Sequence, residues 1–68
     1  MKRQIEVRAQ MIRRGLTYKG MARELRGRGL DVEESDVLAV VNGRRVPDAA
    51  FKTAAAAVLG KPTFELFS

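Results

Sequence analysis

The sequence predicts an all-α domain of five helices, the last of only one or two turns. Two observations predict this fold class: apolar residues recur at helical spacing along nearly the whole chain, and no segment alternates between apolar and polar residues as a half-buried strand would. Glycine, proline and asparagine lie between the periodic segments and divide them. With 68 residues the chain is long enough for one domain, residues 1–68.

The first helix is predicted over residues 3–14. Four apolar residues form one amphipathic stripe at intervals of four, three and four: Ile5, Ala9, Ile12 and Leu16. Gly15 can adopt the left-handed conformation that ends a helix.

The second helix is predicted over residues 18–26, with Thr17 as its N-cap. Its apolar stripe is narrow: Met21, Ala22 and Leu25. Gly20 weakens it by roughly 1 kcal/mol relative to alanine, unless a close neighbour requires the missing side chain. The glycines of "RGRG" then end the helix.

The third helix is short, about residues 33–42. Asp31 and Glu34 have the spacing of a capping box at its start. Three valines are expected in the core: Val37, Val40 and Val41. Asn42 and Gly43 stop the helix, since both residues tolerate positive φ.

The fourth helix is alanine-rich and begins near Pro47, which suits a first helical turn, and Asp48, which complements the helix dipole. Its apolar residues in helical register are Phe51, Ala55, Val58 and Leu59. Gly60 and Pro62 close it. Thr63 caps a final turn from which Phe64 and either Leu66 or Phe67 pack back on the core, and all three phenylalanines are expected to be buried.

Composition excludes several classes of function. The chain has no cysteine and no histidine, so a disulfide framework or a Cys/His metal site is excluded. No carboxylate pair lies among apolar residues that would raise a pKa, so we expect no catalytic site, cofactor or small-molecule substrate. No apolar run approaches the ~18 residues of a membrane span. The expected protein is soluble and cytoplasmic, with an apolar core that a homodimer partner would complete.

Charge is distributed in blocks. Residues 1–28 carry a net charge of +7, residues 29–43 carry −4, and residues 44–68 carry +2, for a total of +5. A basic excess on so small a chain favours a polyanionic partner. The acidic block coincides with the start of the third helix, where carboxylates are favoured by ~0.3–1 kcal/mol each. A solvated surface remains the alternative explanation for the charge runs.

Two stretches together resemble a known family. "GLTYKGMARELR" and "SDVLAVVNGRRVPDAAFKTAAAAVLGKPTFELF" look like the second helix and the recognition-helix-to-end portion of the lambda-repressor and Cro-like helix-turn-helix family, including the small phage Ner-type regulators. The resemblance covers nearly the whole chain. It implies a sequence-specific regulator that binds double-stranded DNA, a phage or prophage repressor, with the third helix in the major groove. A homodimer on two half-sites would supply specificity.

The resemblance also implies which residues touch DNA. Glu34, Ser35 and Asp36 occupy base-facing positions, with Leu38 or Ala39 further along the exposed side. Phosphate contacts are implied for five other positions: Tyr18, Lys19, Asn42, Arg44 and Arg45. Arg28, in the connection that follows the second helix, is a further candidate for contact with DNA. Each has a structural alternative: Tyr18 as a half-exposed packing residue, Asn42 as a helix stop, and the arginines as solvated loop charges.

Two departures from the family leave other functions open. The connection "RELRGRGLDVEE" is about five residues longer than the family has, so Arg26 and Arg28 lie either beside the DNA backbone or away from it. The acidic cluster would repel DNA unless a carboxylate accepts from a cytosine amino group. The alternative is a protein-interaction module on the same fold, an antirepressor or assembly partner that uses the acidic third helix. A third hypothesis, a structured RNA binder, has no stacking motif to support it.

Overall fold

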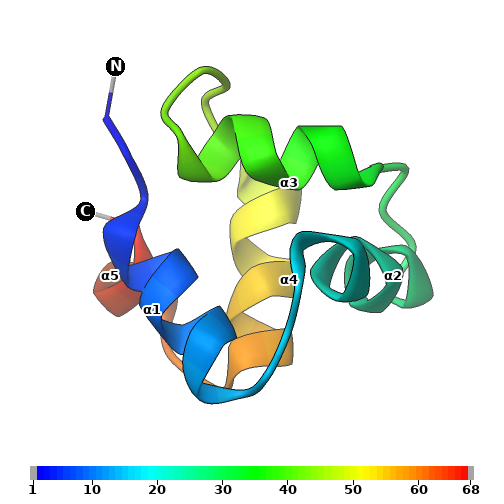
Figure 1. Ribbon diagram of the computed structural model, residues 1–68, viewed down its shortest axis with the longest axis horizontal. Coiled ribbons are helices and arrows are strands. Elements are labelled where there is room, and N and C mark those ends of the chain that lie inside the picture. The colour runs from blue at the N-terminus through cyan, green and yellow to red at the C-terminus, as the bar shows by residue number, and fades with distance from the viewer. Residues whose placement is uncertain (1, 68) are drawn as a thin grey trace.

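The computed structural model describes residues 2–67. Within this range all regular secondary structure is helical, and there is no strand. Its five helices are α1 (Ile5–Arg13), α2 (Tyr18–Gly27), α3 (Glu34–Val41), α4 (Ala49–Leu59) and α5 (Thr63–Leu66). The predicted all-α class is confirmed. In Figure 1, α3 crosses the top of the molecule, α4 runs down behind it, α2 lies to the right, and α1 and α5 lie to the left. None of these helices is long and apolar enough to span a membrane.

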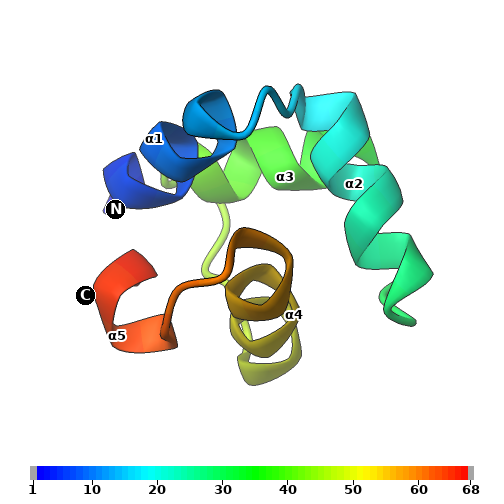
Figure 2. The same cartoon turned by 90° about the horizontal axis from the view of Figure 1, so that it is seen from below.

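The helices form two groups around a single core. Figure 2 shows α1, α2 and α3 on one side and α4 with α5 on the other. The rings of Phe51 and Phe67 meet edge to face, with centroids 6.3 Å apart, a favourable geometry for aromatic pairs. Every helix contributes to the buried apolar residues: Val7, Met11, Met21, Ala22, Leu25, Val32, Val37, Val40, Val41, Phe51, Ala54, Ala55, Leu59, Leu66 and Phe67.

Helix α1 presents a different face to the core from the one predicted. Ile5 and Ile12 are 74% and 64% exposed, whereas Val7 and Met11 are buried. The helix is also shorter than residues 3–14: Gln4 is its N-cap, with a non-helical backbone, and the Gln4 N–H donates to the Val41 carbonyl at 3.0 Å. This anchor joins α1 to α3. Of the predicted stripe, Ile5 and Ile12 face solvent, Ala9 is half-buried, and Leu16 packs against the core.

Helix α2 and its cap match the prediction. Thr17 accepts a hydrogen bond from the Gly20 N–H at 3.0 Å, and Met21, Ala22 and Leu25 are buried. The connection to α3 is an ordered loop rather than a longer helix. Val32 is 4% exposed within this loop, so the loop is held against the core by its own side chain.

The start of α3 lies two residues later than the capping box predicted at Asp31 and Glu34. The box is formed by Glu33 and Asp36: the Glu33 N–H donates to Asp36 Oδ2 at 2.8 Å. Burial of Val32 requires an extended backbone up to Glu33, which is why the helix cannot begin at Asp31. Val37, Val40 and Val41 face the core as predicted, and Gly43 follows with φ of 78°.

Helix α4 begins at Ala49, with Asp48 as its N-cap accepting from the Phe51 N–H at 2.8 Å. Pro47 therefore precedes the cap instead of lying in the first turn. Gly60 ends the helix with φ of 65°.

Helix α5 corrects two predictions about the end of the chain. Its N-cap is Pro62, and Thr63 is the first helical residue instead of the cap. Leu66 and Phe67 pack on the core, but Phe64 is 76% exposed. A helix of four residues can direct only one side toward the core, and Leu66 and Phe67 lie on that side.

Candidate nucleic-acid interface

The face of α3 opposite the core is open to solvent. Because the three valines of α3 point inward, helical geometry places Ser35 and Leu38 on the outer side. Glu34, the first residue of the helix, lines a surface hollow with them, and all three are exposed. Asn42, the C-cap, continues this face and is also exposed. Three of the predicted contact residues, Glu34, Ser35 and Asn42, thus share one surface.

Asp36 does not extend this surface as a free carboxylate. Its Oδ2 accepts from the Glu33 N–H at 2.8 Å, and its Oδ1 accepts from Arg45 Nη1 at 2.8 Å. Both oxygens are engaged, one in starting the helix and the other in holding an arginine from the turn after it. The predicted base-facing residue Asp36 has a structural role here.

A second arginine partners the other end of the acidic block. Arg26 Nη1 donates to the Val32 carbonyl at 3.0 Å and lies 3.8 Å from Glu33 Oε2. Of the four carboxylates of the block, Glu33 and Asp36 are therefore paired with arginines. Asp31 and Glu34 are exposed and have no partner within residues 2–67. The negative charge that the acidic block presents to solvent is consequently smaller than its four carboxylates indicate.

Basic side chains gather at the carboxyl end of α3. Arg45 shares a surface hollow with Lys2 and Lys52, and Arg44 is exposed beside it. The carboxyl end of a helix carries partial negative charge, which favours cations there. The turn is shaped by hydrogen bonds from the Arg44 and Arg45 N–H groups to the Ala39 carbonyl, at 2.8 and 3.2 Å.

Gly43 lets the amino-terminal segment reach this turn. A Cβ at Gly43 would lie 2.8 Å from the Lys2 carbonyl oxygen, which real Cβ atoms do not tolerate. The positive φ of 78° is a second reason for glycine. Residues 2–4 therefore lie against the turn and add their positive charge to it.

Helix α2 supplies exposed basic residues near its start. Lys19 and Arg23 are both exposed and lie four residues apart, so they project from one side of the helix. Tyr18 is half-buried against the core, and its hydroxyl accepts from Arg8 Nη1 at 2.8 Å. The alternative of Tyr18 as a packing residue thus has structural support, although its own O–H remains available as a donor.

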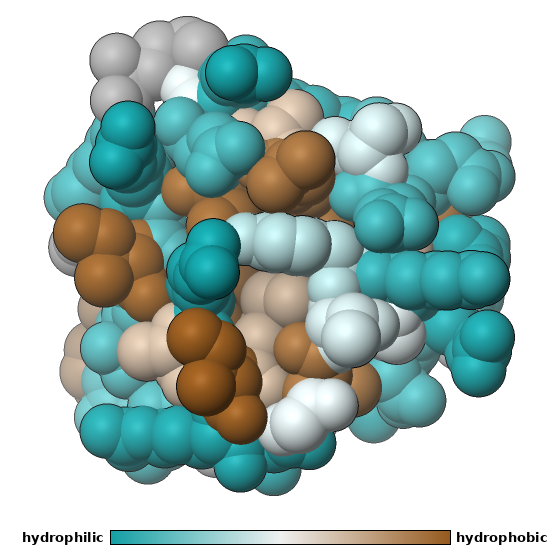
Figure 3. Space-filling view, in the orientation of Figure 1, coloured by the Kyte–Doolittle hydropathy of each residue, from teal (hydrophilic) through white to brown (hydrophobic). Residues whose placement is uncertain are grey.

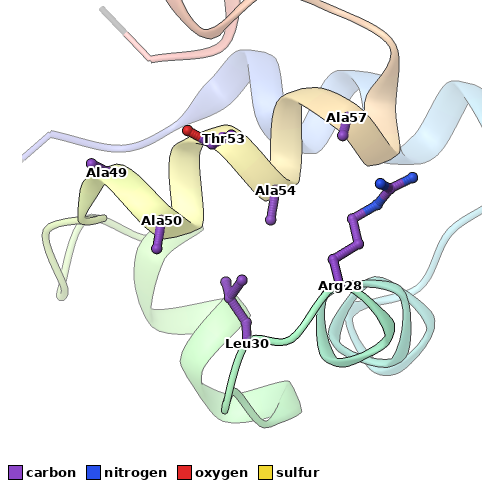
Figure 4. Close-up of a pocket in the computed structure, with 7 residues that line it drawn as sticks. All are labelled: Arg28, Leu30, Ala49, Ala50, Thr53, Ala54 and Ala57. Atoms are coloured by element: carbon purple, nitrogen blue, oxygen red, sulfur yellow. The ribbon is translucent and has the colours of Figure 1, made fainter.

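Arg28 lies apart from the other predicted contact residues. Figure 4 shows its side chain extending from the end of α2 toward Ala57 of α4, beside a hollow lined also by Leu30 and by other small residues of that helix. Of the two arginines at the end of α2, Arg26 contacts the start of α3, whereas Arg28 does not. Arg28 is the C-cap of α2, and the packing of α2 beside α4 accounts for its place.

Four basic residues of this surface were outside the predicted set: Lys2, Arg23, Arg26 and Lys52. The spacing of Arg23 from Lys19 is a sequence signal that could have found it. Lys2 and Lys52 are brought to Arg45 only by the tertiary fold, so no local pattern reports them.

No protein-family model, curated protein or solved structure matches this chain. Its function is therefore inferred from its residues and their arrangement.

Proposed function

We propose that this protein is a sequence-specific DNA-binding transcriptional regulator of the helix-turn-helix type, and that α3 enters the major groove. One observation carries the proposal: the solvent face of α3 holds short and medium-sized side chains and is flanked at both ends by arginines, Arg26 and Arg45. A helix flanked in this way can place side chains on base edges while cations contact the phosphates on either side.

The dimensions of α3 suit this role. Its eight residues give a length of about 12 Å, comparable with the ~12 Å width of the major groove. Phosphates on one side of the groove would meet Lys19 and Arg23 of α2. Phosphates on the other side would meet Arg44 and the hollow that contains Arg45 and Lys52. These positions fix the register of the protein on the duplex but carry no sequence information.

Base recognition falls to the exposed side chains of α3. Glu34 is an unpaired acceptor and can accept a hydrogen bond from the amino group of cytosine. Leu38 is 39% exposed and can contact a thymine methyl group, and Ser35 can donate or accept. A single carboxylate on the reading face disfavours non-specific binding and makes binding depend on a suitably placed cytosine.

The second candidate function is a protein-interaction module that uses the acidic side of α3 against a basic partner. The observation in its favour is that Asp31 and Glu34 are exposed without partners within residues 2–67. The pairing of Glu33 and Asp36 with arginines counts against it, because only two carboxylates of the block remain available for a basic surface.

Fluorescence anisotropy with labelled duplex DNA at two salt concentrations tests the proposal. The double variant Arg44→Glu/Arg45→Glu should abolish binding at low salt. The matched control is Arg14→Glu/Lys61→Glu, which makes the same change in charge near the other end of α4, where Arg14 lies against Gly60. The control should retain most of the affinity. Absence of wild-type binding at low salt, or equal losses in both double variants, would contradict the proposal.

A further inference from the structure

Helix α1 carries a second apolar face, directed away from the core. Ile5 and Ile12 are the most exposed residues of this face, at 74% and 64%, and Ala9, between them on the same side, is half-buried. In Figure 3 the brown, hydrophobic side chains on the left and lower part of the surface lie over α1. Large aliphatic side chains aligned on one exposed helix face are typical of an interaction surface.

The same face has a hollow at its other end. Met11, Ile12, Leu16 and Tyr18 contribute to the lining of a surface depression of about 260 Å³ between α1 and the start of α2. Ile5 lies seven residues before Ile12, so the projecting side chain and the depression are separated by about 10 Å along the helix. One face thus presents both an apolar protrusion and a recess whose lining is apolar apart from Arg8, Thr17 and the Tyr18 hydroxyl.

We propose that a second copy of this chain covers this face, with the two α1 helices antiparallel about a two-fold axis. In this arrangement Ile5 of each protomer enters the hollow of its partner, and the contact is the same in both directions, as an isologous interface requires. Ala9 lies between the two isoleucines, and its small side chain permits close approach of the helices at the axis.

Charge on the flank of this face is also self-complementary. Glu6 and Arg13 lie on the same edge of the apolar stripe, because seven residues are nearly two helical turns. In an antiparallel pair this edge meets the same edge of the partner, which brings Glu6 and Arg13 of one protomer toward Arg13 and Glu6 of the other. Glu6 Oε2 accepts from Gln10 Nε2 at 2.8 Å, so its Oε1 is the oxygen left for the arginine. On the other edge Arg8 is held by Tyr18, at 2.8 Å from its hydroxyl, and is directed back to its own protomer.

The first test is sedimentation equilibrium of the full chain without DNA, so that its result is independent of the proposed DNA binding. One face of a nine-residue helix is small beside the interfaces of stable dimers, so we expect a weak dimer. Ile5→Lys and Ile12→Lys should each raise its dissociation constant at least tenfold. The matched control is Val46→Lys, a similarly exposed aliphatic residue in the loop between α3 and α4, and it should leave association unchanged. A wild-type chain that stays monomeric at about 1 mM, or dimers that both lysine variants leave intact, would overturn the proposal.

The second test uses charge and does not depend on burying a lysine. Glu6→Arg and Arg13→Glu each place like charges opposite one another in their homodimers, so each variant alone should associate more weakly than the wild type. In an equimolar mixture the heterodimer has opposite charges at both contacts, and it should form about tenfold more readily than either homodimer. A mixture that behaves as the average of its components would contradict the antiparallel arrangement. Sedimentation of a monomeric wild-type chain with anionic lipid vesicles would assign the face to a lipid surface and overturn the proposal.

Discussion

The Asp36 carboxylate joins the two ends of α3. Its Oδ2 accepts from the backbone N–H of Glu33 at 2.8 Å, and its Oδ1 accepts from the guanidinium of Arg45, also at 2.8 Å. The helix start and the turn that follows the helix are therefore held by a single side chain. In a DNA complex, Arg45 would have to exchange this carboxylate for a phosphate or contact both.

Removal of the Asp36 charge should strengthen non-specific binding. Asp36→Asn keeps an oxygen that can accept the cap hydrogen bond but removes the ion pair with Arg45. We expect the affinity for duplex DNA of random sequence to rise roughly 3- to 10-fold and the log–log salt slope to steepen by about one unit. Anisotropy titrations at several salt concentrations measure both quantities. Weaker binding with an unchanged slope would show that Asp36 and Arg45 do not act together in binding.

Gly43 should be among the least replaceable residues of the chain. Gly43→Ala combines a positive φ of 78° with a Cβ 2.8 Å from the Lys2 carbonyl oxygen, so we expect it to lower the free energy of unfolding by about 2 kcal/mol or more. Gly27→Ala is the matched control, because a Cβ there meets nothing within 4 Å in helix α2. It should stabilise the protein by up to ~1 kcal/mol. Urea denaturation compares the two variants, and similar stabilities would contradict the described turn.

Substitutions at two neighbouring residues of α3 should have different effects, one on stability and the other on DNA binding. Val37 is fully buried, whereas Leu38 is 39% exposed on the outer face. Val37→Ala should destabilise the fold by roughly 1–3 kcal/mol. Leu38→Ala should change stability by less than ~0.5 kcal/mol yet weaken binding to the preferred DNA sequence. Thermal denaturation together with anisotropy measures both, and the reverse pattern would mean that α3 has another register.

The sequence was sufficient to predict the number of helices and the core face of α2 and α3, because their apolar residues form a single stripe. In α1 two faces are apolar, and periodicity alone cannot tell which one meets the core. The face that does so is the one that carries Val7 and Met11. The capping box was placed two residues early because burial of Val32 is a tertiary effect, which no local pattern reports.

The predicted contact residues divide in the same way. Ser35 follows from the helix register, Glu34 from its place at the helix start, and Arg44 and Arg45 from their place after the helix. The position of Arg28 beside α4 depends on the packing of α2 against α4, and the meeting of Lys52 with Arg45 depends on the packing of α4. Such contacts join residues far apart in the sequence, so they can be identified only once the fold is known.

Glu34 should determine a base preference. It is the carboxylate of the α3 reading face that has no partner within residues 2–67. Glu34→Gln should reduce discrimination in favour of cytosine at one position of the site by about 1–3 kcal/mol. Selection of bound sequences from a randomised duplex pool measures this, with Glu65→Gln on α5 as the control. An unchanged preference at every position would exclude Glu34 from base contact.

The most direct test of the central claim is NMR mapping of the isotopically labelled protein during titration with its selected duplex. We expect the largest changes in amide chemical shift on the solvent face of α3, at Glu34, Ser35 and Leu38, and in the turn at Arg44 and Arg45. The carboxyl end of α4 should change little. Shifts confined to α1 and α4, or no shifts at low salt, would contradict DNA binding through α3.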